Sequence, residues 1–290
     1  MSSKYVVVCL AGLIAALALP VYAADGPANL GTAQVGQVDS RWFVDLRVFD
    51  TDNNDQDWYD NSTFSLGFNS PINEKTDFTL TYSGYSGSGP DEVNEAIRDS
   101  ERKVISPVVK RLITGADSKA AVAFSIGADI ALSQIKAVNT NSGEEAYQDN
   151  FTPAAKLQIE WGKPGATQFQ IAGQVAFWDT LCETSVGSPI PGFGTVVAVG
   201  GGISKPFGKK LTLVGDCMGL VKGYNVINEE FNTPDNTLVW SAGGNWAFGG
   251  ASNACLSVYA TNSMGPTLGS SIIAAPDDSI ALGVALRRDF

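Results

Sequence analysis

Charged and amide side chains recur at every second position of several apolar stretches in this sequence. In TQFQIAGQVAFW, for example, Gln168, Gln170 and Gln174 alternate with Phe169 and Ile171. Such side chains hold water and small polar solutes by hydrogen bonds, and they also pair with one another. The set of this kind comprises Asp45, Arg47, Asp129, Lys156, Gln158, Glu160, Gln168, Gln170, Gln174, Asp216 and Arg287. The alternation therefore predicts a polar surface that either contacts a permeating solute or braces the protein from within.

The residue types give little support to an enzyme. The chain contains no histidine, which is the usual general base beside a nucleophilic serine. Serines such as Ser125 and Ser257 therefore lack an evident activator. The sequence predicts no enzymatic activity.

A metal site is also not expected. The stretch DTDNNDQDWYD begins like a calcium-binding loop, with Asp50, Asp52 and Asn54. It departs from that pattern at Asp55, where the loop needs a glycine, and at Asn61, where it needs a bidentate glutamate. We expect a solvated acidic loop that divalent cations bridge to lipopolysaccharide phosphates. The cysteines lack the spacing of a zinc site or a disulfide framework, so no cofactor is predicted.

The alternation is itself the signature of β-strands with two different faces. It begins in RWFVDLRVF at Arg41 and recurs in STFSLGF, DFTLTYS, AKLQIEW and TQFQIAGQVAFW, which predicts an all-β fold. KVISPVVKRLIT, residues 103–114, leaves two alternatives open. It reads as a further strand, but Pro107 cannot donate to a strand ladder, and the spacing of Val108 and Leu112 also fits a helix.

Short and long connections alternate along the chain. NSPINEKT, TGADSK, GKPGA, SKPFGKK and FGGASN are short and rich in turn residues, whereas SGSGPDEVNEAIRDSE and NSMGPTLGSS are among the long polar ones. Barrels of the outer membrane have tight periplasmic turns and longer external loops. Counting residues 103–114 as a strand gives about twelve, an even number. The pattern predicts an up-and-down antiparallel transmembrane β-barrel over residues 41–290, with the long connections outside.

The N-terminus has the features of a secretory signal. Lys4 precedes an uncharged apolar run from Val6 to Leu19, and small residues lead to a cleavage site after Ala23. Beyond this run, no stretch of the sequence is apolar for long enough to form a membrane-spanning helix. We expect a signal peptide at residues 1–23, a flexible periplasmic leader at 24–40 and the barrel at 41–290.

The chain ends in SIALGVALRRDF. Together with the signal and the alternating loops, this ending resembles the C-terminal strand of Gram-negative outer-membrane β-barrel proteins, a porin-like class without a specific family. The resemblance implies that Leu282, Val284, Leu286 and Phe290 form a signal for the barrel assembly machinery. Because every backbone group in lipid must be paired, we expect the last strand to pair with the first.

About twelve strands enclose a narrow lumen, wider than that of an eight-stranded barrel. Lined by the polar set, it predicts a porin-like channel in the cell outer membrane for passive passage of small polar solutes. An alternative is an outer-membrane receptor, adhesin or structural barrel with a closed lumen and partner-binding external loops, and a third is a soluble secreted β-protein. The net charge of −11 argues against nucleic acid as a partner, and leaves outer-membrane lipid and lipopolysaccharide as the expected surroundings.

Overall fold

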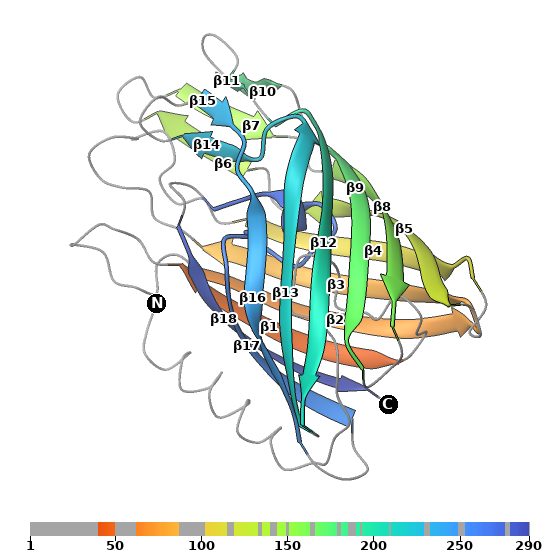
Figure 1. The fold of residues 1–290 in the computed structure, drawn as a ribbon. Coiled ribbons are helices and arrows are strands. Elements are labelled where there is room, and N and C mark those ends of the chain that lie inside the picture. Colours follow the sequence, from red (N-terminus) through yellow and green to blue (C-terminus); the bar gives the residue numbers. More distant parts are fainter. Residues whose placement is uncertain are drawn as a thin grey trace.

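Twelve antiparallel strands close into a single barrel (Figure 1). The computed structural model describes residues 40–49, 62–86, 102–114, 119–132, 135–139, 144–148, 151–162, 166–178, 181–184, 190–191, 193–208, 210–228, 233–248, 253–275 and 279–289. The strands follow one another around the barrel in the order β1-β18-β17-β16-β13-β12-β9-β8-β5-β4-β3-β2. The predicted fold class, an antiparallel barrel of about twelve strands, is confirmed.

The barrel strands have the following bounds. They are β1 Arg41–Phe49, β2 Ser62–Asn73, β3 Thr76–Ser86, β4 Arg102–Leu112, β5 Ala120–Ala131, β8 Phe151–Trp161, β9 Gln168–Phe177, β12 Thr195–Phe207, β13 Leu211–Lys222, β16 Val239–Ala247, β17 Asn253–Thr261 and β18 Ala281–Asp289. Among the described residues, no helix combines the length and the apolar character needed to cross a bilayer.

The ambiguous stretch at residues 103–114 forms strand β4, so the strand interpretation is confirmed and the helix alternative is wrong. Pro107 pairs with Leu80 of β3, but the register between β4 and β5 is interrupted at Ser106 and Pro107. Proline is tolerated here because the ladder toward β5 does not need its missing N–H. A Cβ added to Gly127 of β5 would lie 2.4 Å from the Pro107 carbonyl oxygen. Glycine therefore permits the close approach of the two strands.

Large apolar side chains cover the outside of the barrel, and polar side chains face its inside. In β2, Phe68 is 50 % exposed whereas Asn69, its neighbour in the strand, is 2 % exposed. Leu282 of the last strand is 62 % exposed. A water-soluble β-protein buries its apolar face, and lipid surrounds that face in a transmembrane barrel. The distribution is therefore that of a membrane-spanning barrel.

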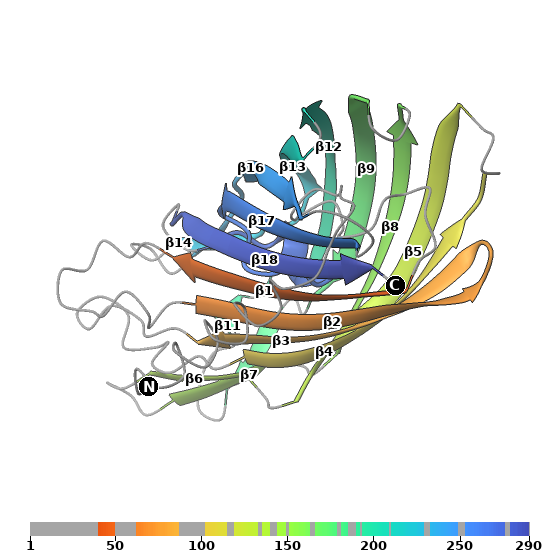
Figure 2. The same ribbon diagram turned by 90° about the horizontal axis from the view of Figure 1, so that it is seen from below.

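The first and last strands close the barrel, as predicted. Strand β1 pairs antiparallel with β18, from Arg41 opposite Asp289 to Phe49 opposite Ala281, and the two lie side by side in Figure 2. In β18, Leu282 faces outward, Val284 is partly buried and Leu286 is buried. Phe290 lies outside the described residues, as do the signal, the leader before residue 40 and the acidic stretch DTDNNDQDWYD. Recognition of this ending by the assembly machinery stays a prediction.

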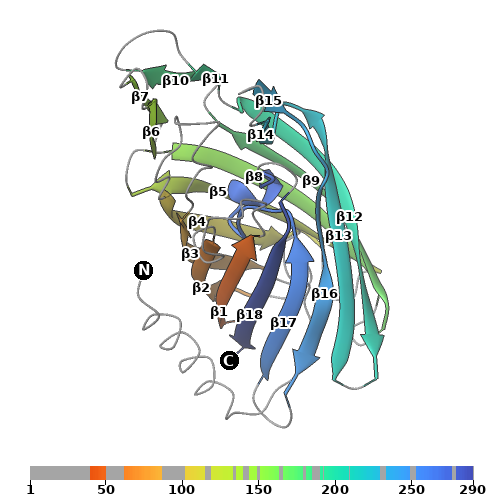
Figure 3. The ribbon, with the colours of Figure 1, turned by 90° about the vertical axis from the view of Figure 1, so that its left-hand side faces the viewer.

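Two small sheets stand at one end of the barrel (Figures 1 and 3). Strands β6 (Ile135–Asn139), β7 (Glu144–Gln148), β10 (Leu181–Thr184) and β11 (Ile190–Pro191) form one sheet, and β14 (Val226–Asn228) pairs with β15 (Thr233–Asp235) in the other. They belong to three of the long connections predicted from the sequence. The described parts of these three long connections thus gather at one end of the barrel.

The long connection between β17 and β18 does not project outward. The stretch NSMGPTLGSS was expected as an external loop, and this expectation is wrong. Residues 262–275, here called the inner segment, fold into the barrel and include the short 3-10 helix η1 (Ser270–Ile272). Most of the inner segment is buried. The segment folds inward because Leu268, Ile272 and Ile273 are apolar and pack against the barrel wall.

The inward face of β1 and β2 provides a test of the barrel packing. The Phe43 ring lies across Gly67, so that a Cβ added to Gly67 would lie 2.1 Å from Phe43 Cε1. Gly67→Ala should therefore lower the free energy of unfolding in lipid vesicles by about 1–3 kcal/mol, because the ring has to move. In a Phe43→Ala background, the same substitution should cost clearly less.

Gly173→Ala is the matched control, because a Cβ there would meet nothing within 4 Å. Urea titration of the four variants and the parent measures the coupling between the two positions. Equal losses for Gly67→Ala with and without Phe43 would contradict this packing.

Candidate functional site

The polar set predicted from the sequence lies on the inward-facing positions of the barrel strands. Within it, Glu160, Gln170 and Asp216 are partly buried. The buried members are Asp45, Arg47, Asp129, Lys156, Gln158, Gln168, Gln174 and Arg287. Gln168 donates a hydrogen bond to Glu160 at 3.2 Å, and Asp216 interacts electrostatically with Lys156. The structure thus brings the set into one interior, but divides it among separate groups of contacts. Whether these residues line a conducting path stays a prediction.

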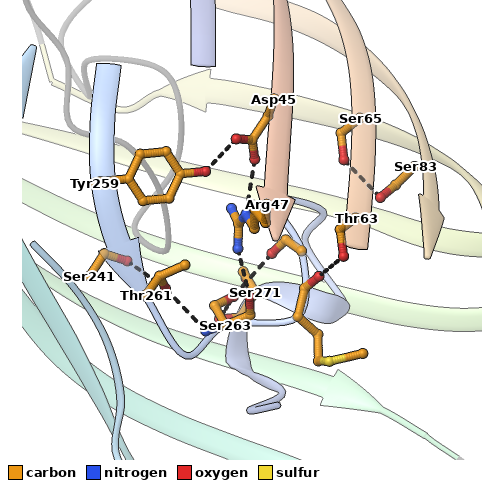
Figure 4. A network of polar contacts seen from close by, with 12 residues as sticks. Asp45, Arg47, Thr63, Ser65, Ser83, Ser241, Tyr259, Thr261, Ser263 and Ser271 are labelled. Atoms are coloured by element: carbon orange, nitrogen blue, oxygen red, sulfur yellow. Dashed lines mark hydrogen bonds and ion pairs between the residues drawn. The ribbon is translucent and has the colours of Figure 1, made fainter. Parts of the chain in front are cut away.

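One group of contacts crosses the seam where the barrel closes (Figure 4). The Tyr259 ring of β17 lies over Gly283 of β18, and a Cβ added to Gly283 would lie 2.3 Å from Tyr259 Cζ. Beyond that glycine, the Tyr259 hydroxyl donates to Asp45 Oδ1 of β1. Arg47 Nε donates to Asp45 Oδ2 at 3.0 Å, and the guanidinium lies 5.6 Å from the Tyr259 ring centroid. These contacts connect three consecutive strands on the inner side of the seam.

The same group extends to the inner segment. Arg47 Nη1 donates to the Ser263 carbonyl oxygen at 2.9 Å, and Thr63 Oγ1 donates to the Met264 carbonyl oxygen at 2.8 Å. A buried arginine paired with a carboxylate and bonded to backbone oxygens is fixed in position. Asp45 and Arg47, predicted as lumen-lining, therefore brace the seam and hold the start of the inner segment.

The inner segment reaches the opposite wall of the barrel. Thr267 Oγ1 donates to Asp129 Oδ2 of β5 at 2.5 Å. In the barrel order, β5 lies six strands from β17 in either direction, so this contact spans the interior. Gln174 Nε2 of β9 donates to the Leu268 carbonyl oxygen at 2.6 Å and to Ser271 Oγ at 2.9 Å. Polar residues of β5 and β9 thus form hydrogen bonds with residues 267–271, here called the tip of the inner segment.

The other side of the inner segment is apolar. Leu268, Ile272 and Ile273 pack with small or apolar side chains of the inner wall, most of them on β8, β9, β12, β13 and β16. The wall residues in this cluster are Ala154, Ala172, Ala176, Trp178, Val196, Ala198, Met218, Val226 and Val239. Burying a side chain such as leucine or isoleucine stabilises by about 1.5–3 kcal/mol relative to full exposure. The inner segment therefore has a core of its own inside the barrel.

A second polar cluster lies toward the end of the short turns. Lys110 of β4 forms an ion pair with Asp77 of β3 at 2.8 Å, and Asn69 of β2 accepts a hydrogen bond from Thr79 at 2.6 Å. Asp77, Lys110 and Tyr259 are absent from the polar set predicted from the sequence. The period-two alternation, however, places each of them in the inward phase of its strand, and this signal would have found them.

Some buried polar atoms of the interior have no hydrogen-bond partner among the described residues. They include Ser106 Oγ, Asp129 Oδ1 and Gln174 Oε1. A buried polar atom left without any partner costs about 1–3 kcal/mol. Two of these atoms belong to Asp129 and Gln174, whose side chains hold the inner segment. The boundary between this segment and strands β5 and β9, here called the far wall, is therefore suited to water or a small polar solute.

Comparisons with known proteins concern the fold alone. No protein-family model and no curated protein matches this sequence. The chain is similar to the translocator domain of autotransporter NalP from Neisseria meningitidis, with 14 % identity over 88 % of this chain and 89 % of that chain and a TM-score of 0.45. It is similar to the toluene transporter TodX of Pseudomonas putida, with 8 % identity over 93 % of this chain and 99 % of that chain and a TM-score of 0.45. The predicted likeness to outer-membrane β-barrels is thus confirmed at the level of the fold.

A third similar structure corrects a prediction. Outer membrane phospholipase A from Escherichia coli matches with 11 % identity over 86 % of this chain and 96 % of that chain and a TM-score of 0.40. An enzyme therefore shares this barrel fold. The prediction from the sequence that the chain is no enzyme is wrong as an exclusion, because the fold admits catalysis as well as transport.

The seam network generates a stability prediction. Tyr259→Phe removes the hydroxyl that reaches Asp45 and leaves a buried carboxylate oxygen with one partner fewer. The free energy of unfolding in lipid vesicles should fall by about 1–3 kcal/mol. Tyr82→Phe is the matched control, because the Tyr82 side chain occupies an outward position of β3. Urea titration compares the two, and equal effects of both substitutions would contradict a bracing role for Tyr259.

Proposed function

We propose that this chain is an outer-membrane β-barrel channel that lets small polar solutes pass through its lumen. The observation that carries the proposal is the placement of charged and amide side chains on the inward face of most barrel strands, while the outward face is largely apolar. A lysine or arginine turned to lipid at the membrane midplane would cost about 2–4 kcal/mol. Inside, the same groups offer hydrogen bonds and charge to a hydrated solute.

The inner wall near Lys156 belongs to the proposed path, and Lys156 lies opposite Gln174 of β9 in the strand register. Lys156 and Gln158 of β8 face inward with Asp216 of β13, and the two strands are separated by β9 and β12. Charges of both signs on one wall suit small polar or zwitterionic solutes better than ions of a single sign.

A second candidate is a surface protein whose lumen stays closed and whose long connections bind a partner. The inner segment favours it, because the contact between Thr267 and Asp129 crosses the interior. The small sheets at the same end of the barrel would provide the binding surface. Electrical conductance separates the two candidates, since a closed surface protein does not conduct.

The proposal includes the route to the membrane. Residues 1–23 would direct export and be removed after Ala23, residues 24–40 would remain as a periplasmic leader, and the last strand would be read by the barrel assembly machinery. Lipopolysaccharide would surround the end that carries the small sheets, because that end holds the long connections.

Single-channel recording in planar bilayers tests the proposed function. The purified full chain should give discrete conductance steps, and Lys156→Gln should raise the permeability of cations over anions. The change should be at most about fivefold, because a unit charge contributes roughly 1 kcal/mol at 4 Å in water. Lys75→Gln in the exposed turn between β2 and β3 is the matched control and should leave the ratio unchanged.

A folded protein is recognised by its heat-dependent migration in electrophoresis. A second variant, in which Asn-Gly replaces residues 264–273, lacks most of the inner segment that crosses the interior. If the parent and this variant are both folded and neither gives conductance steps, the proposed function is contradicted.

A further inference from the structure

We propose that the inner segment is a gate: it holds the lumen closed in the resting protein, and solutes pass only when its tip leaves the far wall. This inference rests on the proposed function, because a gate presupposes a channel. Residues 262–275 are the element that has an open and a closed position. Asp129 of β5 and Gln174 of β9, which lie on the wall opposite the base of the segment, hold the closed position.

The base of the inner segment is fixed. Ser263 and Ala274 form an antiparallel bridge, and the Met264 N–H donates to the Ile273 carbonyl oxygen at 3.0 Å. Asn262 is tied to the start of β16, since its side chain accepts from the Trp240 N–H at 2.8 Å and donates at 2.8 Å to the carbonyl oxygen of Leu238, the residue before β16. The base is therefore a short hairpin stem attached to the near wall.

The tip is held differently from the base. Its link to β5 is the side-chain contact of Thr267 with Asp129, and its link to β9 is made by the Gln174 side chain. Asn225, which follows β13, donates its side-chain N–H to the Ile272 carbonyl oxygen at 3.1 Å. None of these links belongs to a strand ladder, and the barrel closes through its own twelve pairings without them. Releasing the tip therefore leaves the barrel intact.

The position of the inner segment, across the interior, also allows it to close the lumen. The tip contacts β5 and β9, while the base belongs to the connection between β17 and β18, so the segment lies across the interior rather than along one wall. The stem contact through Arg47 and Ser263, drawn in Figure 4, keeps the seam side occupied as well. A solute entering from the end with the small sheets therefore meets this segment.

The contacts set the expected balance between the two positions. Leu268, Ile272 and Ile273 are covered in the closed position, and exposing them to water disfavours opening. The open position is then a minor state with a population of at most about 10 %. The alanines at 172 and 176 leave a shallow, apolar wall when the tip departs, and Asp129 Oδ1 and Gln174 Oε1 are acceptors already suited to water.

Shortening the gate tests the inference. Because Ser263 and Ala274 are bridged, replacing residues 264–273 by Asn-Gly keeps the stem as a two-residue hairpin. The time-averaged conductance should rise at least about 10-fold over the parent chain, because the rise equals the inverse of the open population of the parent. The matched control replaces residues 140–143, between Asn139 of β6 and Glu144 of β7, by the same Asn-Gly, and should conduct like the parent.

A disulfide lock tests the closed position without removing the segment. A Cβ added to Gly269 would lie 3.4 Å from Asp129 Cβ, close to the separation of about 3.5–4.5 Å found in disulfides. Asp129→Cys with Gly269→Cys, in a chain whose native cysteines are replaced by alanine, should lose its conductance steps on oxidation. Dithiothreitol should restore them, and the reduced form of the same chain is the control.

The outcomes separate the gate from the channel. When the parent conducts, a shortened variant that conducts no more than the parent, or an oxidised lock that still conducts, overturns the gate and leaves the channel standing. A parent and a shortened variant that are both folded and both silent overturn the channel, and the gate with it.

Discussion

The structure depends on one constraint: every backbone N–H and C=O inside hydrocarbon has to be paired within the protein. Twelve strands meet this constraint only when the first pairs with the last, which β1 and β18 do along their whole length. Closure then fixes which side chains face lipid, because neighbouring residues of a strand point to opposite faces. Tyr259, Asp45 and Arg47 reinforce the seam from inside, where the ring of Tyr259 lies over Gly283.

The interior is divided by the inner segment into two kinds of wall. Toward β5 and the seam, side chains such as Asp129, Arg47 and Thr63 bind its polar groups. Toward β9 and β12, its isoleucines pack against small residues. A barrel wall made of ladder hydrogen bonds is rigid, whereas Asp129 and Gln174 hold the inner segment by side-chain contacts that the proposed gate would release. The contacts that cross the interior are therefore compatible with the proposed conduction.

Much of this architecture was predictable, because alternation with period two is a local property of the sequence. It identified the strands, the inward phase of residues such as Lys156, and closure by the last strand. The course of the inner segment was not predictable in this way, since NSMGPTLGSS has the composition of an external loop. Its inward fold depends on Ala172 and Ala176 leaving room on distant strands. Pairing between distant side chains, as for Asp77 and Lys110, requires the register of the strands.

A membrane-spanning barrel requires, above all, that lipid contacts its apolar face. Nitroxide labels at single cysteines in place of Val199 and Ile203, which face outward on β12, and of Ser204 and Gln170, which face inward, measure this contact in lipid vesicles. The outward labels should collide readily with oxygen, which concentrates in the bilayer, and the inward ones with a water-soluble nickel chelate or with neither reagent. Outward labels that meet the nickel chelate as freely as a label at the exposed Lys75 would contradict the account.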